Sequence, residues 1–159
     1  MMEKTEEYIK ARSRAIKYIM YKMRTSLEVY NKLKELEFPE KEINCVIEDL
    51  TQLDYINDEE YAKKFIESNI KTKKLSKNVL KLKLKNKGIS EEIIDKYLRV
   101  LGVSDIDAII KILEKKKFLK TIDFDEKNNI KLYCMRKGFS ISDINQAIKE
   151  ISFKEGECN

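Results

Sequence analysis

Lysine is the side chain that this sequence concentrates most strongly. Between residues 68 and 90 there is no acidic residue, and the segment holds eight lysines, namely Lys71, Lys73, Lys74, Lys77, Lys81, Lys83, Lys85 and Lys87. The formal net charge of the whole chain is only +5, so positive charge is concentrated here. At about 100° per residue, four of them lie within about 80° of one another on a helix. We call these four the basic row: Lys74, Lys77, Lys81 and Lys85.

The basic row predicts contact with nucleic-acid phosphates or with an acidic protein surface, with an affinity that falls as salt rises. The alternative is a solvated lysine face in a lysine-rich protein. Lysine offers a point charge and not the two-pronged hydrogen bonding that reads a base edge. Sequence-specific DNA recognition is therefore not predicted.

Other reactive side chains are few. The chain has no histidine, the residue that most often performs acid–base chemistry near neutral pH. Its three cysteines are far apart and form no Cys-x-x-Cys pair, so we expect no zinc site; they are Cys45, Cys134 and Cys158. The first two lie at apolar helix positions and are predicted to be core residues. The sequence predicts no catalytic residue, metal or cofactor, and hence a binding protein, not an enzyme.

Composition predicts a helical protein of the cytoplasm. Charged residues make up 38% of the 159 residues, with one proline, four glycines and no tryptophan, which is typical of a soluble helical chain. No stretch approaches the roughly 18 apolar residues of a membrane span. Residues 1–8 carry acids where a signal peptide needs a basic region and an apolar run.

The elements that position the lysines repeat about every fifty residues. Phe38, Ile89 and Phe139 each open the last helix of a copy and lie 51 and then 50 positions apart. A fixed period of this size indicates stacked helical modules. We expect an all-α protein of three tandem three-helix, helix-turn-helix-like modules stacked into an elongated, curved body. The expected modules cover residues 1–54, 55–102 and 103–159.

Apolar spacing near 3.6 residues and local capping signals predict the helices. Gly88 and Gly138 are expected to end helices in the left-handed conformation, and Ser90 and Ser140 to cap the helices that follow. The helices of the second and third modules are predicted at 58–71, 76–87, 90–101, 105–118, 127–137 and 140–151. In the first module the predicted apolar stripes are Ile16, Ile19, Met20 and Met23; Leu27, Tyr30, Leu33 and Leu36; and Ile43, Val46, Ile47, Leu50 and Leu53.

Three stretches carry a family resemblance. In residues 15–33 a predicted helix ends in Arg24, a hydroxyl residue follows, and a second helix contains a Lys-Leu pair. Residues 53–62 read Leu-Asp-Tyr-Ile-Asn-Asp-Glu-Glu-Tyr-Ala, and residues 84–91 read Leu-Lys-Asn-Lys-Gly-Ile-Ser-Glu. In this order the stretches resemble the RecX family of recombinase regulators, from about residue 11 to 151. The signature positions are Asp58, Tyr61, Ala62 and Gly88.

The resemblance implies a fold, a partner and an activity. It implies three three-helix modules that lie along the groove of a RecA–DNA filament and restrain filament assembly, strand exchange and ATP hydrolysis. It places the protein in DNA recombination, DNA repair and the SOS response. The implied partner is the RecA filament, within which single- or double-stranded DNA is contacted. A monomer suits such a groove binder.

Several of these residues also have simpler structural interpretations. We expect Asp58 to cap the helix that contains Tyr61, and Tyr61 to pack in the core with Phe65. Arg24 either complements the dipole at the end of the first helix or reaches an acidic partner, and both remain open.

A second function class is direct, non-sequence-specific DNA binding by helix-turn-helix-like modules. Tyrosines among basic residues can stack on single-stranded bases, although they also serve as core residues; the candidates are Tyr18, Tyr21 and Tyr30. Acids in the last helices, such as Glu91 and Glu92, argue against those helices lying in a DNA groove. A third function class is a helical scaffold that binds an unrelated acidic protein. The composition of the chain fits this class equally well, and only the family-like signature argues against it.

Overall fold

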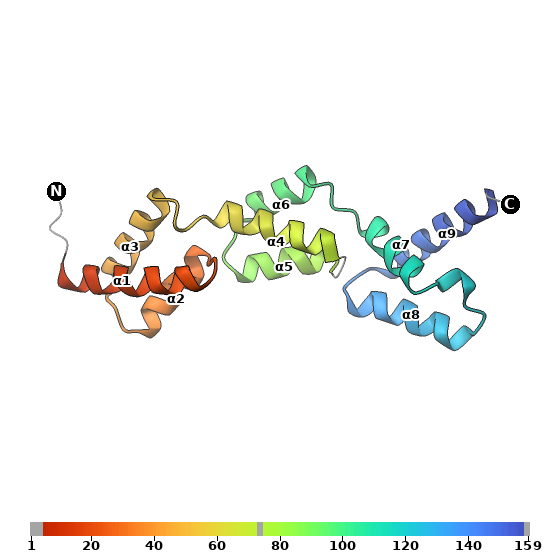
Figure 1. Cartoon of the computed structure of the whole chain (residues 1–159), viewed down its shortest axis with the longest axis horizontal. Coiled ribbons are helices and arrows are strands. Elements are labelled where there is room, and N and C mark those ends of the chain that lie inside the picture. Colours follow the sequence, from red (N-terminus) through yellow and green to blue (C-terminus); the bar gives the residue numbers. More distant parts are fainter. Residues whose placement is uncertain (1–4, 73–74, 158–159) are drawn as a thin grey trace. The chain divides into compact units, whose positions relative to one another are not determined.

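The computed structural model describes residues 5–72 and 75–157, within which the chain forms nine α-helices, one short 3-10 helix and no strand (Figure 1). The all-α prediction is confirmed. Lys74 of the basic row and Cys158 lie outside the described residues. Among the helices described, none combines the length and the apolar character needed to cross a membrane.

The helices follow the predicted order. They are α1 (Glu6–Tyr21), α2 (Ser26–Glu35), α3 (Glu40–Gln52), α4 (Asp58–Thr72), α5 (Lys77–Asn86), α6 (Glu91–Val100), α7 (Asp105–Lys115), η1 (Phe118–Lys120), α8 (Phe124–Arg136) and α9 (Ile141–Glu157). The largest departures lie in the last third of the chain. There α7 gives way to the 3-10 helix, α8 begins three residues before the expected position 127, and α9 continues beyond the expected 151.

The chain divides into two compact units. The first comprises Met1–Lys64 and Leu84–Ile94, and the second comprises Phe65–Lys83 and Asp95–Asn159. Helices α4, α5 and α6 each contribute residues to both units. The units therefore do not follow the expected module boundaries at 54/55 and 102/103, which stay a prediction.

In the first unit, α1 packs against α2 and α3, and α2 packs against α3. The expected stripe on α1 is confirmed in part: Ile16 and Ile19 are partly buried against this core. The other half is wrong, because Met20 is 79% exposed and Met23 lies beyond the end of the helix. Ala11 and Ala15 are buried on this face of α1. Their small side chains let α1 approach its neighbours closely, but alanine is only weakly apolar and therefore stands out little in the sequence. The buried cluster is Tyr8, Ala11, Ala15, Val29, Leu33, Ile43, Val46, Leu50 and Ile56.

In the second unit, α7 packs against α8, α9 and the 3-10 helix, and α8 packs against α9. Cys134 is fully buried, as predicted, and burial raises the pKa of its thiol. Cys45 is half-buried against the core of the first unit. The buried cluster of the second unit is Ala108, Ile109, Ile110, Ile112, Leu113, Phe118, Ile130, Cys134, Phe139, Ile144, Ala147 and Ile151.

Helices α4 to α6 bury small and aliphatic side chains. Tyr61 and Phe65, expected in the core, are half-buried, whereas Ala62 and Ile66 on the same helix are fully buried. On α5 the apolar side chain of Leu82 is 59% exposed. The fully buried leucines of that helix are Leu80 and Leu84.

Candidate functional site

The start of α2 is closed by a capping box. Thr25 is fully buried, and its hydroxyl accepts a hydrogen bond from the Glu28 amide at 3.2 Å. The Glu28 carboxylate accepts one in return from the Thr25 amide at 3.1 Å. Two backbone donors that have no partner inside the helix are thereby satisfied.

The Asp58 carboxylate lies against the same helix start. Its Oδ1 accepts a hydrogen bond from the Ser26 amide at 2.8 Å, and its Oδ2 accepts one from the Ser26 hydroxyl. The cap of α4 is instead Asn57, whose Oδ1 accepts from the Glu60 amide at 2.8 Å. The expectation that Asp58 caps its own helix is therefore wrong. Its negative charge complements the N-terminal dipole of α2, to which it joins the start of α4.

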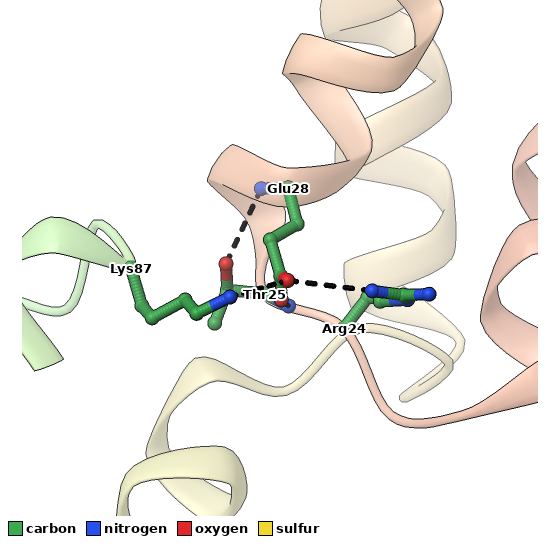
Figure 2. Close-up of polar contacts among 4 residues, drawn as sticks. All are labelled: Arg24, Thr25, Glu28 and Lys87. Carbon is green, nitrogen blue, oxygen red and sulfur yellow. Dashed lines mark hydrogen bonds and ion pairs between the residues drawn. The ribbon is translucent and has the colours of Figure 1, made fainter. Parts of the chain in front are cut away.

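Figure 2 shows the Glu28 carboxylate between two cations. The Lys87 amine approaches Oε1 at 2.7 Å, and an Arg24 guanidinium nitrogen lies 3.5 Å from the same oxygen. The Glu28 side chain is only 15% exposed. Burial alone would raise its pKa, but the hydrogen bonds from Lys87 and Thr25, with the nearby Arg24 charge, leave the pKa of Glu28 lowered. Glu28 is thus a carboxylate held in its ionised form.

Arg24 lies in the connection after α1, not at the helix end where it was expected, because α1 stops at Tyr21. Its guanidinium stands 4.1 Å from the centroid of the Tyr18 ring, in cation–π geometry. The Arg24 side chain is 13% exposed, and its Nε is buried with no hydrogen-bond partner among the described residues. These contacts favour an intramolecular role, and contact with an acidic partner stays a prediction.

Two more signature residues border this helix start. Gly88 has a φ of +81°, which confirms the predicted left-handed helix end. A Cβ at Gly88 would lie 2.6 Å from the Cβ of Leu27, in the first turn of α2. Burial, and secondly the Glu28 charge, raise the pKa of Tyr61. Ala62, as noted, is fully buried.

Two of the described lysines of the basic row, Lys81 and Lys85, form ion pairs within the protein, so less of their charge is available to a partner than the sequence suggests. The Lys81 amine lies 2.6 Å from Asp95, and the Lys85 amine lies 3.1 Å from Glu91. Lys77 is half-buried, and none of the ion pairs between described residues includes its amine. Acids of α6 therefore offset part of the charge of α5.

Sequence reasoning missed Thr25 and Glu28 as partners of the signature residues. The signal was present as a hydroxyl residue followed three positions later by glutamate, the pattern of a capping box. Ser140 does cap its helix as predicted, accepting from the Asp143 amide at 3.0 Å. In the described part of the chain, no group of three or more acidic or cysteine side chains is placed to hold a metal ion.

Comparison with known proteins identifies three consecutive domains. Residues 11–50 match the family model described as the first three-helix domain of RecX, residues 57–98 match the second, and residues 104–148 match the third. An all-helical chain with three successive domains of this kind defines a tandem-repeat regulatory protein.

Comparison with individual proteins also finds RecX proteins. The chain is 34% identical over 153 residues to the Regulatory protein RecX of Clostridium acetobutylicum, covering 92% of this chain and 71% of that protein. It is 32% identical to that of Bacillus velezensis, covering 93% of this chain and 57% of the relative. The crystal structure of RecX from Lactobacillus salivarius superposes with a TM-score of 0.77 at 29% identity, covering 93% of this chain and 98% of that one. The chain belongs to the RecX family.

Proposed function

We propose that this protein binds a RecA–DNA filament and inhibits filament assembly, strand exchange and the associated ATP hydrolysis. The observation that carries the proposal is the series of three RecX domain matches, in order, between residues 11 and 148. Curated relatives are named regulatory proteins. The identity of the regulated recombinase comes from the family resemblance.

The proposed mechanism uses binding alone, without catalysis or a cofactor. One monomer bridges adjacent recombinase subunits in the cytoplasm, with successive domains contacting successive subunits. Each contact is weak, but the second and third form at high effective concentration once the first is made. A protein bound in this way obstructs a second DNA strand and resists the subunit movements that accompany ATP turnover.

Within this proposal, the lysines of α5 contact phosphate or an acidic surface of the filament. Lys77 contributes most among the described lysines of the basic row, because Lys81 and Lys85 each form an ion pair within the protein. Lys74 belongs to the same proposal and lies outside the described residues.

One observation favours the second candidate, direct binding to single-stranded DNA. Of the three tyrosines considered for base stacking, Tyr18 is covered by Arg24, and Tyr30 donates to Glu40 at 3.1 Å. Tyr21 is 84% exposed and is followed directly by Lys22. An exposed ring beside a cation can stack on a base while the cation meets the phosphate.

The two candidates are separated by measuring binding to single-stranded DNA alone and to the same DNA coated with RecA and a slowly hydrolysed nucleotide. The RecA ATPase is followed in parallel. Much tighter binding to the coated filament, with a lowered ATPase, supports the regulator. Equal or tighter binding to bare DNA, with an unchanged ATPase, rejects it in favour of direct DNA binding.

A further inference from the structure

The starts of α2 and α5 are each closed by a buried hydroxyl. Thr25 and Ser76 are 0% and 1% exposed, and they are the buried polar residues of the described chain. The Ser76 hydroxyl accepts from the Val79 amide at 3.3 Å, as Thr25 accepts from Glu28. The first helix start lies within the first compact unit and the second within the other.

At both positions an aspartate from the next domain completes the cap. The Lys77 amide donates to Oδ1 of Asp105 at 2.9 Å, as the Ser26 amide donates to Oδ1 of Asp58 at 2.8 Å. Asp58 is the first residue of α4, and Asp105 is the first residue of α7. The same backbone donor of each middle helix is therefore satisfied by the same position of the following domain.

A glycine from the next domain closes over each helix start. Gly138 has a φ of +89°, and a Cβ there would overlap Val79 and would lie 2.7 Å from the Ser76 hydroxyl oxygen. Gly88 closes over the first turn of α2 in a similar way, but its contact is with Leu27, the second residue of that helix, whereas Val79 is the third residue of α5. Both positions combine a left-handed backbone with a contact too close for any side chain.

The outer domains provide internal controls. In the first domain the position that corresponds to Gly88 is Glu37, which is exposed and adopts a φ of +60°. In the third domain the cap that corresponds to Thr25 is Asp123, and it is exposed. Glycine and a buried hydroxyl thus occur where two domains meet, and charged residues occur at the equivalent positions on the surface.

The two meeting points are not identical. The third residue of the middle helix is Glu28 in the first and Val79 in the second. The Thr25 amide donates to the ionisable Glu28 carboxylate, whereas the Ser76 amide donates to the backbone carbonyl of Lys137 at 3.2 Å. The Lys137 amine lies 5.4 Å from the Tyr133 ring centroid, and Lys87 pairs with Glu28.

We infer that Asp58 with Gly88, and Asp105 with Gly138, are positioning residues of one repeated junction that fixes each domain to the next. We further infer that Glu28 makes the first junction sensitive to acid at the Thr25 amide, whereas the corresponding Ser76 amide of the second junction donates to a backbone carbonyl and lacks this sensitivity. The second junction has a carboxylate of its own, Asp105, whose pKa is raised mainly by burial. The groups that face Glu28 are Arg24, Lys87 and the Tyr61 hydroxyl, with Tyr18 and Asp58 beside them. The consequence for filament binding rests on the proposed function, but the junction itself does not.

The test is amide hydrogen exchange, resolved by residue, on the full chain without RecA. Asp58→Ala removes an acceptor from Ser26 and should lower the protection factor of that amide by about 10-fold or more, since a lost hydrogen bond of about 1.4 kcal/mol is a factor of ten. The Lys77 amide should be unchanged, and Asp105→Ala should give the reverse pattern. Asp58→Asn, which keeps an acceptor oxygen, should restore part of the protection. Unchanged protection of Ser26 in Asp58→Ala would overturn the inference.

A second measurement remains decisive even if the alanine variants unfold. In the wild-type chain, lowering the pH from 6 to 3 should reduce the protection factor of the Thr25 amide more than that of the Ser76 amide, whose acceptor is a backbone carbonyl. In Glu28→Gln, which cannot ionise, Thr25 should lose this pH dependence. Equal pH dependence at Thr25 and Ser76, or its persistence in Glu28→Gln, would refute the acid-sensitive junction. Neither result depends on RecA, so failure here is distinct from failure of the proposed function.

Discussion

Replacing Gly88 by alanine tests how tightly the first junction is packed. An L-residue in the left-handed region costs roughly 1–2 kcal/mol. The new Cβ would also stand 2.6 Å from the Cβ of Leu27, and forcing an extra methyl group into a packed contact costs about 1–3 kcal/mol. We therefore expect Gly88→Ala to lower the free energy of unfolding by about 2–5 kcal/mol.

Gly102 supplies a matched control. Its φ is +60°, and a Cβ there would meet nothing within 4 Å. Gly102→Ala should therefore show the conformational cost alone, roughly 1–2 kcal/mol. Urea unfolding followed by circular dichroism gives both values, with the slope of the transition reporting whether the native or unfolded state has changed.

The double variant Gly88→Ala with Leu27→Gly isolates the contact, because glycine, unlike alanine, also removes the Leu27 Cβ that lies 2.6 Å from the new methyl group. If the junction is packed as described, truncating Leu27 should recover part of the loss, so the two substitutions should be non-additive by about 1 kcal/mol or more. Equal losses in Gly88→Ala and Gly102→Ala, with simple additivity in the double variant, would refute the reasoning. In that case Leu27 would move aside at no cost.

Three further substitutions test the left-handed Glu37, the ionised Glu28 and the binding role of Lys77. Glu37→Gly should raise the free energy of unfolding by about 1 kcal/mol in the same assay, because it relieves a left-handed glutamate on the surface; no gain would contradict this. Because the pKa of Glu28 is lowered from its ordinary value of 4.5, its ionised contacts stabilise the fold above about that pH and stop doing so as pH falls through the folded-state pKa. Glu28→Gln should thus cost about 1–2 kcal/mol at pH 7 and progressively less as the pH is lowered below 4.5. Urea titration at each pH measures this cost, and a constant cost would rule out the ionic contribution. Lys77→Gln should weaken filament binding and lower the slope of log affinity against log salt by about one, whereas the exposed Lys111→Gln on α7 should not; matching losses in both variants would remove Lys77 from the contact surface.

Helix ends were predictable from sequence because their signals are local. Gly88 and Gly138 indicated left-handed helix ends, and Ser140 indicated a cap, from neighbours within four positions. The core face of α1 was predicted only in part, through Ile16 and Ile19. Ala11 and Ala15 were missed because they gain their burial from close helix packing and not from strongly apolar side chains. Lys77, Lys81 and Lys85 could be placed on one helix, but the ion pairs of Lys81 and Lys85 depend on where α6 lies.

The role of Asp58 could not be predicted in the same way. A local pattern makes aspartate at a helix start look like a cap for its own helix, and here Asn57 takes that role. The partner of Asp58 is Ser26, 32 positions away, and only the folded chain brings them together. A comparison of the repeats with one another offers the remaining signal, since Thr25 and Ser76 share the 51-residue spacing of Phe38 and Ile89.

The repeated junction has a consequence for how such a chain can grow. The middle domain carries both halves of the junction: a hydroxyl-capped helix start that receives the next domain, and an aspartate and a glycine that close over the previous one. A tandem duplication of the gene segment for this domain would therefore encode a copy that already matches its neighbours on both sides. Lengthening the array by gene duplication would keep the aspartate, the glycine and the capped helix start at every junction, whereas a duplicated first domain would bring Glu37 to a position that glycine occupies at both existing junctions.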